Sequence, residues 1–168
     1  MKSLAKIVAA TSMAILFSLS PIALIAGGSH DHSHGHKMEF DPVEKEFGEY
    51  KPKMKVTRTI EVGMSDEMRF TPDVIRVKKG DVIEFKHKNN GKIMHEFVLG
   101  TQDSLDEHAE MMKKFPGMEH EEPYMAHVAP GKSGTIMWRF TKVGEFSFGC
   151  LIPGHYDAGM KGKIIVES

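Results

Sequence analysis

The stretch GEFSFGCLIPGHYDAGMKGKIIV, residues 144–166, carries the most specific pattern in this chain. Apolar and polar residues alternate at both of its ends, as they do in half-buried β-strands. The loop between these runs has the spacing Cys-x4-His-x4-Met, from Cys150 through His155 to Met160. Proline and glycine within the loop suit a compact turn. The stretch therefore predicts a strand, a tight loop that carries metal-ligand side chains, and a second strand.

A thiolate, an imidazole and a thioether on one loop match the donors of an electron-transfer copper site. In such a site two histidines and one cysteine surround the ion in a plane, and a methionine binds weakly along the axis. The simpler alternative is a structural cysteine, a surface histidine and a core methionine that lie close together by chance. Cys150 is the only cysteine, so no disulfide can form within the chain. In an oxidising compartment a free thiol is a liability unless it is buried or bound to metal, and we favour the metal-bound thiol.

The second imidazole must come from elsewhere in the chain, and two histidines compete for this position. His95, in KIMHEFVLG, follows the turn sequence NNG at 89–91 and begins an apolar run. It is therefore expected at the end of a strand, where functional side chains project from a rigid scaffold. His87 lies in the alternating run VIEFKHK, on the face that carries the apolar residues of that strand. We expect His95 to be the ligand, with His87 as the competitor.

Residues 1–28 are expected to be a secretory signal peptide. Two lysines form a positive start, an apolar run follows over residues 7–26, and small residues at 26–28 offer cleavage sites. An uncleaved membrane anchor is the alternative, but the apolar core of residues 9–19 is shorter than the ~20 residues of a typical span. We therefore predict export to the periplasm and no stable membrane insertion after cleavage.

Residues 29–53 are expected to form a disordered tail and a linker. The tail, residues 29–38, shows no apolar periodicity, and residues 39–52, which are charged and carry two prolines, are expected to form a linker or an irregular first edge. The tail opens with alternating histidines that can chelate a divalent metal ion, namely His30, His32, His34 and His36. Cleavage after Gly27 would leave a free amine followed by His30 at the third position. Such an N-terminus can bind Cu(II) in a square plane.

Residues 54–168 are expected to form one domain of short β-strands. Alternating runs separated by glycine turns predict about seven or eight strands in an antiparallel β-sandwich. One helix interrupts them, from Ser104 to Lys114, with Asp103 or Ser104 as its N-cap. The net charge of −1 lacks the basic excess typical of nucleic-acid binding, so we expect no nucleic-acid partner.

Residues 54–168 resemble the cupredoxin family, which includes plastocyanin, azurin and rusticyanin. The resemblance rests on FTPDVIRVKKGDVIEF, on MHEF around His95, on VAPGKSGTIMWRF, and above all on residues 144–166. It implies an all-β, antiparallel Greek-key β-sandwich with a short helical insertion. It also implies one type 1 copper ion held by His95, Cys150, His155 and Met160. The loop spacing is similar to that of rusticyanin, and HEFVLG with the Met- and His-rich insertion resembles the CopI-type periplasmic cupredoxins linked to copper tolerance.

The resemblance further implies a periplasmic protein of copper tolerance or homeostasis that acts by copper binding and one-electron redox cycling. A soluble electron carrier for a respiratory oxidase or reductase is the alternative, and a copper chaperone is a third. A redox partner protein is expected, with His155 as the exposed ligand. Four protein donors leave no open position for a substrate, so we expect no enzyme; oxidation of Cu(I) by the site is left open. We expect a monomer.

Methionines and histidines are frequent in this chain, which has 13 and 10 of them. Many gather after His95, where they could form a second copper site: His108, Met111, Met112, Met118, His120, Met125 and His127. On a helix, His108 lies one turn from Met111 and Met112, and thioethers beside imidazoles suit copper. The alternative is that Met111 or Met112 belongs to the apolar face of the helix. Met118 with His120 is the preferred pair, because the surrounding PGMEHEEP is expected to be exposed.

Overall fold

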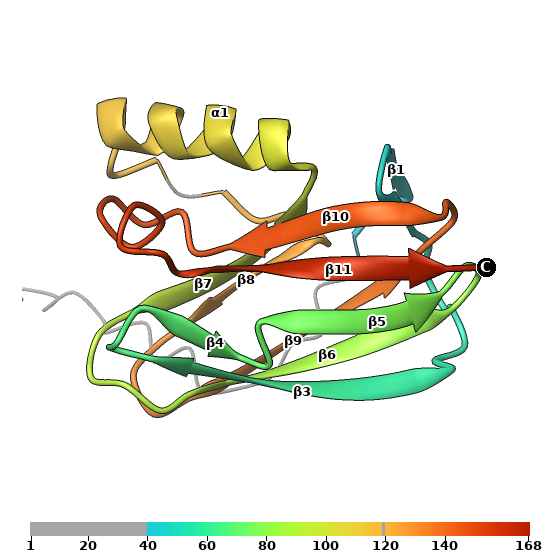
Figure 1. Ribbon diagram of the computed structural model, residues 1–168. Helices are drawn as coiled ribbons and strands as arrows, with labels where there is room; N and C mark the ends of the chain where they lie inside the picture. Colours follow the sequence, from blue (N-terminus) through green and yellow to red (C-terminus); the bar gives the residue numbers. More distant parts are fainter. Residues whose placement is uncertain (1–39, 119) are drawn as a thin grey trace, which may run out of the picture. The chain divides into compact units, whose positions relative to one another are not determined.

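Two β-sheets lie face to face in the part of the chain that the computed structural model describes, residues 40–118 and 120–168 (Figure 1). The first sheet has the order β1-β2-β9-β6-β3-β4. Its strands are β1 (Val43–Lys45), β2 (Gly48–Tyr50), β9 (Ser133–Arg139), β6 (Val82–Asn89), β3 (Arg58–Ser65) and β4 (Arg69–Thr71). The second sheet has the order β5-β11-β10-β7-β8. Its strands are β5 (Val74–Lys78), β11 (Lys161–Glu167), β10 (Gly144–Gly149), β7 (His95–Gly100) and β8 (Met125–Val128).

The main core fills the space between the sheets and follows directly from the alternation along each strand. In β6, Phe85 is buried, while its neighbours Glu84 and Lys86 lie on the outer side. Aromatic rings from both sheets meet in this core: the rings of Phe85 in β6 and Phe97 in β7 have centroids 5.4 Å apart. Such aromatic pairs add to the free energy gained by burying their area.

The all-β sandwich predicted from the sequence is confirmed, but its strands are not all antiparallel. Strands β3 and β6 pair in parallel, and so do β5 and β11. The chain passes from β4 in the first sheet to β5 in the second and returns with β6, so that β3 and β6 run in the same direction. The described residues contain 11 strands. The additional ones, β1, β2 and β4, have three residues each and are too short to show a periodicity.

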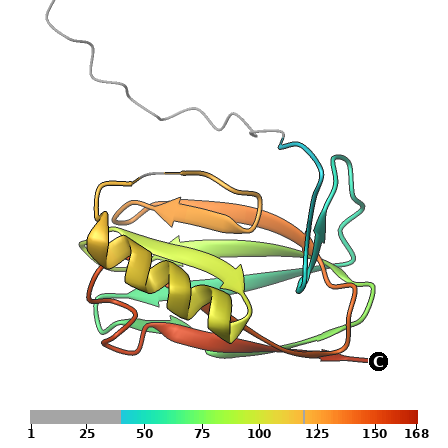
Figure 2. The same cartoon turned by 90° about the horizontal axis from the view of Figure 1, so that it is seen from above.

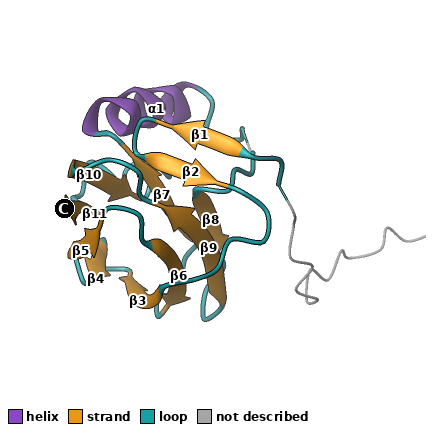
Figure 3. Cartoon of the chain, turned by 90° about the vertical axis from the view of Figure 1, so that its right-hand side faces the viewer, coloured by secondary structure: helices purple, strands orange, loops and turns teal. Residues whose placement is uncertain are grey.

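A short hairpin precedes residue 54, in the segment expected to be a linker or an irregular first edge. Residues 43–50 form this hairpin of β1 and β2, which joins the edge of the first sheet where Glu49 pairs with Arg139 of β9 (Figure 3). Between these strands Phe47 is buried, and its carbonyl oxygen accepts a hydrogen bond of 3.1 Å from Trp138 Nε1–H. Apart from Phe47, the hairpin is charged or polar at most positions, and its short strands conceal the pattern.

The single helix described, α1 (Gln102–Lys114), covers the outer face of the second sheet at β7 and β10 (Figure 2). Its N-cap is Thr101, whose hydroxyl accepts a hydrogen bond from the Ser104 N–H, while the Thr101 N–H donates to Ser104 Oγ. The predicted caps Asp103 and Ser104 are therefore wrong. Both residues lie inside the first turn of the helix. The N-cap position belongs to Thr101, whose hydroxyl accepts the hydrogen bond of the Ser104 N–H.

The buried stripe of α1 consists of Leu105, Ala109 and Met112, spaced at four and three residues. These side chains pack against Val98, Leu151 and other residues in a second, smaller core. Strand β7 is buried at every position, because the main core covers one of its faces and the helix covers the other.

The predicted signal peptide of residues 1–28 and the histidines of the tail lie outside the described residues. Within residues 40–118 and 120–168, no helix is both long enough and apolar enough to span a bilayer.

Candidate metal centre

The pairing of β7 with β10 brings together residues that are far apart in the sequence. The two strands are antiparallel, with Val98 opposite Gly149, so the beginning of β7 lies beside the end of β10. His95 is the first residue of β7, and Cys150 directly follows β10. A rigid pair of strands therefore positions both side chains at one end of the sandwich.

The loop from Cys150 to Met160 is closed by its own backbone. The Cys150 N–H donates to the Met160 carbonyl oxygen at 3.0 Å, and the Met160 N–H donates to the His155 carbonyl oxygen at 3.0 Å. Gly159 has a φ of +95°, in the left-handed region that glycine adopts without strain. A side chain there would also press on the guanidinium of Arg69. These constraints turn the loop back so that His155 returns to Cys150.

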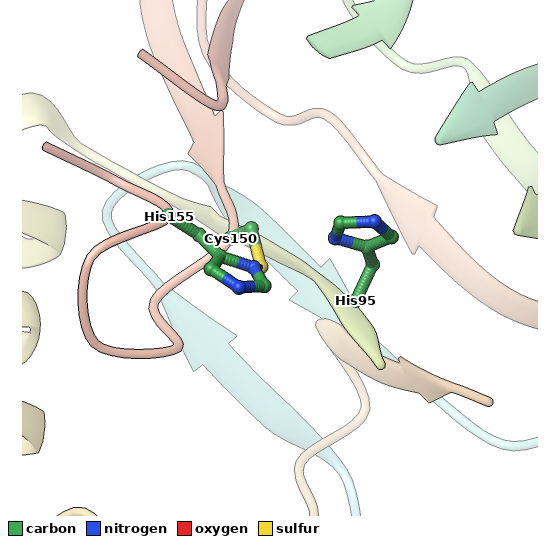
Figure 4. A group of neighbouring side chains, drawn as sticks. All are labelled: His95, Cys150 and His155. Atoms are coloured by element: carbon green, nitrogen blue, oxygen red, sulfur yellow. The ribbon is translucent and has the colours of Figure 1, made fainter. Parts of the chain in front are cut away.

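Three donor atoms converge at this end of the sandwich (Figure 4). One ring nitrogen of His95, Cys150 Sγ and one ring nitrogen of His155 all lie within 4.8 Å of one another. Cys150 Sγ is 3.3 Å from His155 Nδ1, and the two imidazole rings have centroids 5.1 Å apart. Met160, the predicted axial ligand, is fully buried and hydrogen-bonded through its backbone to Cys150. Its role as a ligand stays a prediction.

His95 presents one nitrogen to this site and anchors the other. Its Nε2 lies 3.1 Å from Asp66 Oδ1, while its Nδ1 is buried and has no hydrogen-bond partner. A carboxylate behind a ligating histidine fixes the ring and its tautomer and raises the basicity of the donor nitrogen. The Lys92 N–H donates to Asp66 Oδ2 at 2.7 Å, and this bond, together with His95, lowers the pKa of Asp66. The buried, unpaired Nδ1 is the position expected of a metal ligand.

Cys150 is a protonated thiol when no cation is bound to it. Burial raises its pKa to about 12, against the partial effect of the Glu96 N–H, which donates to Sγ at 3.3 Å. The pKa of His155 is lowered, first by burial and then by the nearby charge of His95, so its imidazole is favoured in the neutral form. Metal binding at this site must displace the thiol proton. One soft sulfur and two imidazoles are a donor set that fits copper.

His87, the competitor for the second imidazole, lies elsewhere in the main core. It is 1% exposed, its ring centroid is 4.3 Å from that of Phe97, and neither ring nitrogen has a hydrogen-bond partner. Burial lowers its pKa to about 3. The structure therefore groups His95, and not His87, with Cys150 and His155.

The residues predicted for a second copper site lie partly in the core and partly at the surface. Met112 and Met125 are buried in the core under α1, and Met112 lies on the apolar face of the helix, which was the alternative given for it. His108 and His120 lie together, with ring centroids 5.0 Å apart. Exposed side chains at Met111 and Met118 are 43% and 40% accessible, respectively. His127 forms an ion pair of 3.0 Å with Glu96.

Two residues near the centre were not identified from the sequence, Asp66 and Glu96. Asp66 lies 29 residues before His95, in the turn between β3 and β4. Glu96 is 5% exposed although its side chain is a carboxylate, and it directly follows His95, an expected ligand. A carboxylate beside an expected ligand, in an otherwise apolar run, is a signal that could have identified Glu96. Nothing in the local sequence distinguishes Asp66 from other acidic turn residues.

Comparison with known proteins gives one family match and several relatives. The model of the copper-binding proteins of the plastocyanin/azurin family matches residues 56–167. A protein of Rubrivivax gelatinosus named copper-resistant cuproprotein CopI is 46% identical over 143 residues, which cover 84% of this chain and 87% of that protein. A protein of Vibrio cholerae with the same name is 34% identical over 135 residues, which cover 80% of this chain and 78% of that protein.

The solved structures that resemble this chain have the same fold. Reduced auracyanin from Roseiflexus castenholzii has a TM-score of 0.58 and 23% sequence identity, over 68% of this chain and all of that one. An azurin from Methylomonas has a TM-score of 0.53 and 16% identity, over 67% of this chain and all of that one. At these identities the likeness concerns the β-sandwich.

Proposed function

Since this chain belongs to the plastocyanin/azurin family of copper-binding proteins, we propose that it protects its host from copper by binding the ion and cycling it between Cu(I) and Cu(II). The convergence of His95, Cys150 and His155 within 4.8 Å carries this proposal. The names of the relatives, copper-resistant cuproproteins, support the role in tolerance. We also propose that the protein is exported to the periplasm, as its N-terminal sequence predicts.

The ligands would hold copper on a scaffold that changes little between oxidation states. Asp66 fixes the His95 ring, and the Glu96 N–H donates to the cysteine sulfur. The closed backbone of the loop holds His155. His95, Cys150, His155 and Met160 would hold the ion, and copper bound to this donor set would supply one-electron transfer. Hydrogen bonds to the ligands and the buried surroundings of the sulfur tune the ion.

His155 is the ligand through which we expect electrons to leave. It is partly exposed, whereas His95 and Cys150 are fully buried. A partner protein would therefore dock at the loop from Cys150 to Met160 and accept the electron there. We do not expect a conventional enzyme, because a site filled by protein donors leaves no open position for substrate.

A deletion strain complemented with two forms of the gene tests the role. Wild-type protein should restore growth in copper, and the Cys150→Ser variant should not, although it accumulates in the periplasmic fraction to the same level. Respiration without added copper should be normal in all strains. A respiratory defect without copper sensitivity would contradict the proposal and favour an electron carrier that serves an oxidase or reductase.

A further inference from the structure

The outer face of β7, which α1 covers, holds a buried carboxylate. Glu96 is 5% exposed, and its Oε1 lies 3.0 Å from Nε2 of His127, which faces it on the neighbouring strand β8. The Glu96 carboxylate also acts electrostatically on His108 of α1 and raises the pKa of that imidazole in part. A buried carboxylate of this kind stabilises a cation bound nearby.

Two imidazoles meet at this place from different elements. His108 lies in the middle of α1 and His120 in the segment that follows the helix, and their ring centroids are 5.0 Å apart at an angle of 39°. Both residues are partly buried. A metal ion forms bonds of about 2 Å to nitrogen, so an ion bound between two imidazoles holds their nitrogens up to about 4 Å apart. Ring centroids 5.0 Å apart allow that distance between one nitrogen of His108 and one of His120.

The protonation state of His108 suits a ligand. Burial lowers its pKa most, and the nearby charge of His120 lowers it further, against the opposite effect of Glu96. The neutral ring therefore predominates at neutral pH, and its lone pair is available to a metal.

Soft donors flank both histidines. Met111 follows His108 by three residues on α1, and Met118 precedes His120 by two. Both side chains are exposed, unlike Met112, which packs under the helix. Exposed methionine gains little from packing, and its thioether selects Cu(I).

We propose that His108 and His120, assisted by the thioether of Met111 or Met118, form a second metal site that binds Cu(I) above the buried Glu96. This site is separate from the cluster of His95, Cys150 and His155, and it depends on the proposed function only in that copper reaches the protein. The site would raise the number of Cu(I) ions that each chain binds by one.

An anaerobic titration of the mature full-length chain with Cu(I), against bicinchoninate as competitor, measures this capacity. We expect the variant His108→Asn/His120→Asn to bind one Cu(I) ion fewer per chain than wild type. The matched control Glu107→Gln/Glu121→Gln changes exposed neighbours on the same two segments and should keep the wild-type number. Equal numbers in wild type and the histidine variant would overturn the proposal. The visible spectrum of the same samples with Cu(II) reports on the Cys150 site, so failure of that site is a separate result.

A second measurement on wild-type protein does not depend on the folding of a variant. Ag(I) has the ligand preferences of Cu(I) without its redox chemistry. The first equivalent should bind the thiolate site at Cys150, and a second equivalent should shift the ring ¹⁵N resonances of both His108 and His120. Unshifted resonances would overturn the proposal. The variant Met111→Leu/Met118→Leu should bind Cu(I) more weakly than wild type while it keeps both imidazoles. Unchanged affinity would refute the part assigned to the sulfurs.

Discussion

His87 should make the metal-free protein sensitive to acid, and the substitution His87→Phe should remove this sensitivity. The imidazole is buried between the rings of Phe85 and Phe97, and burial lowers its pKa from 6.5 to about 3, against a smaller opposite effect of the Gly134 backbone. Between these values the unfolded chain binds a proton that the folded chain excludes. Stability is therefore fully present above pH 6.5 and is lost as the pH falls toward 3.

The magnitude follows from the two pKa values. Each pH unit within the window costs about 1.4 kcal/mol, so His87 alone should lower the free energy of unfolding by about 2.5 kcal/mol between pH 7 and pH 4.5. Phenylalanine keeps the ring contact with Phe97 and cannot titrate. Its larger volume adds an offset of about 1–3 kcal/mol that does not depend on pH.

Urea unfolding of both proteins at the two pH values, with chelator present, measures the difference. Wild type should lose about 2.5 kcal/mol more than His87→Phe on acidification. Titration of the other groups is common to both proteins and cancels. A core variant away from the imidazole, Phe140→Leu, should be less stable at both pH values but keep the wild-type pH dependence. Equal losses in wild type and His87→Phe would refute the assignment of a neutral, buried imidazole.

Four other substitutions or treatments test the site and its supports. Asp66→Ala should weaken copper binding about 10–100-fold in a competition titration, since His95 loses its anchor; unchanged affinity would show that the anchor is dispensable. In metal-free protein at pH 8, alkylation of Cys150 by iodoacetamide should be about a thousandfold slower than in the urea-unfolded chain, and similar rates would disprove the raised pKa. Thr101→Ala should lower the free energy of unfolding by about 1 kcal/mol, measured by urea titration, and no change would contradict its role as N-cap. Gly48→Ala should cost about 1–3 kcal/mol in the same assay, because its φ is +136° and a side chain would clash with the β9 backbone; a neutral result would mean that the β1–β2 hairpin contributes nothing to the fold.

The metal loop could be predicted from the sequence because its donors lie within 11 consecutive residues, from Cys150 to Met160. The second imidazole could not be assigned from one short motif, since both His95 and His87 lie in runs that predict a strand. The fold decides between them: His95 is at the end of β7 that adjoins β10, whereas the ring of His87 packs against Phe97 within the main core. Alternation assigns a side chain to a face but does not say which strand ends meet.

The supports of the site could not be predicted, because they are made by contacts over long sequence distances. Asp66 reaches His95 across 29 residues, and the Glu96 N–H reaches Cys150 across 54. These pairs depend on which strands are neighbours. The same holds for Met112 and Met125, whose thioethers resemble metal ligands in the sequence but fill the core under α1. Methionine serves both purposes, and only burial distinguishes them.

The most direct test of the copper centre is the visible spectrum of the purified mature protein with one equivalent of Cu(II), recorded beside the Cys150→Ser variant. The wild-type protein should show intense bands of charge transfer from thiolate to copper, and the variant should lack them, because the sulfur that converges with His95 and His155 is gone. A wild-type protein that binds copper without these bands, or a variant that keeps them, would contradict the assignment of Cys150 as a copper ligand.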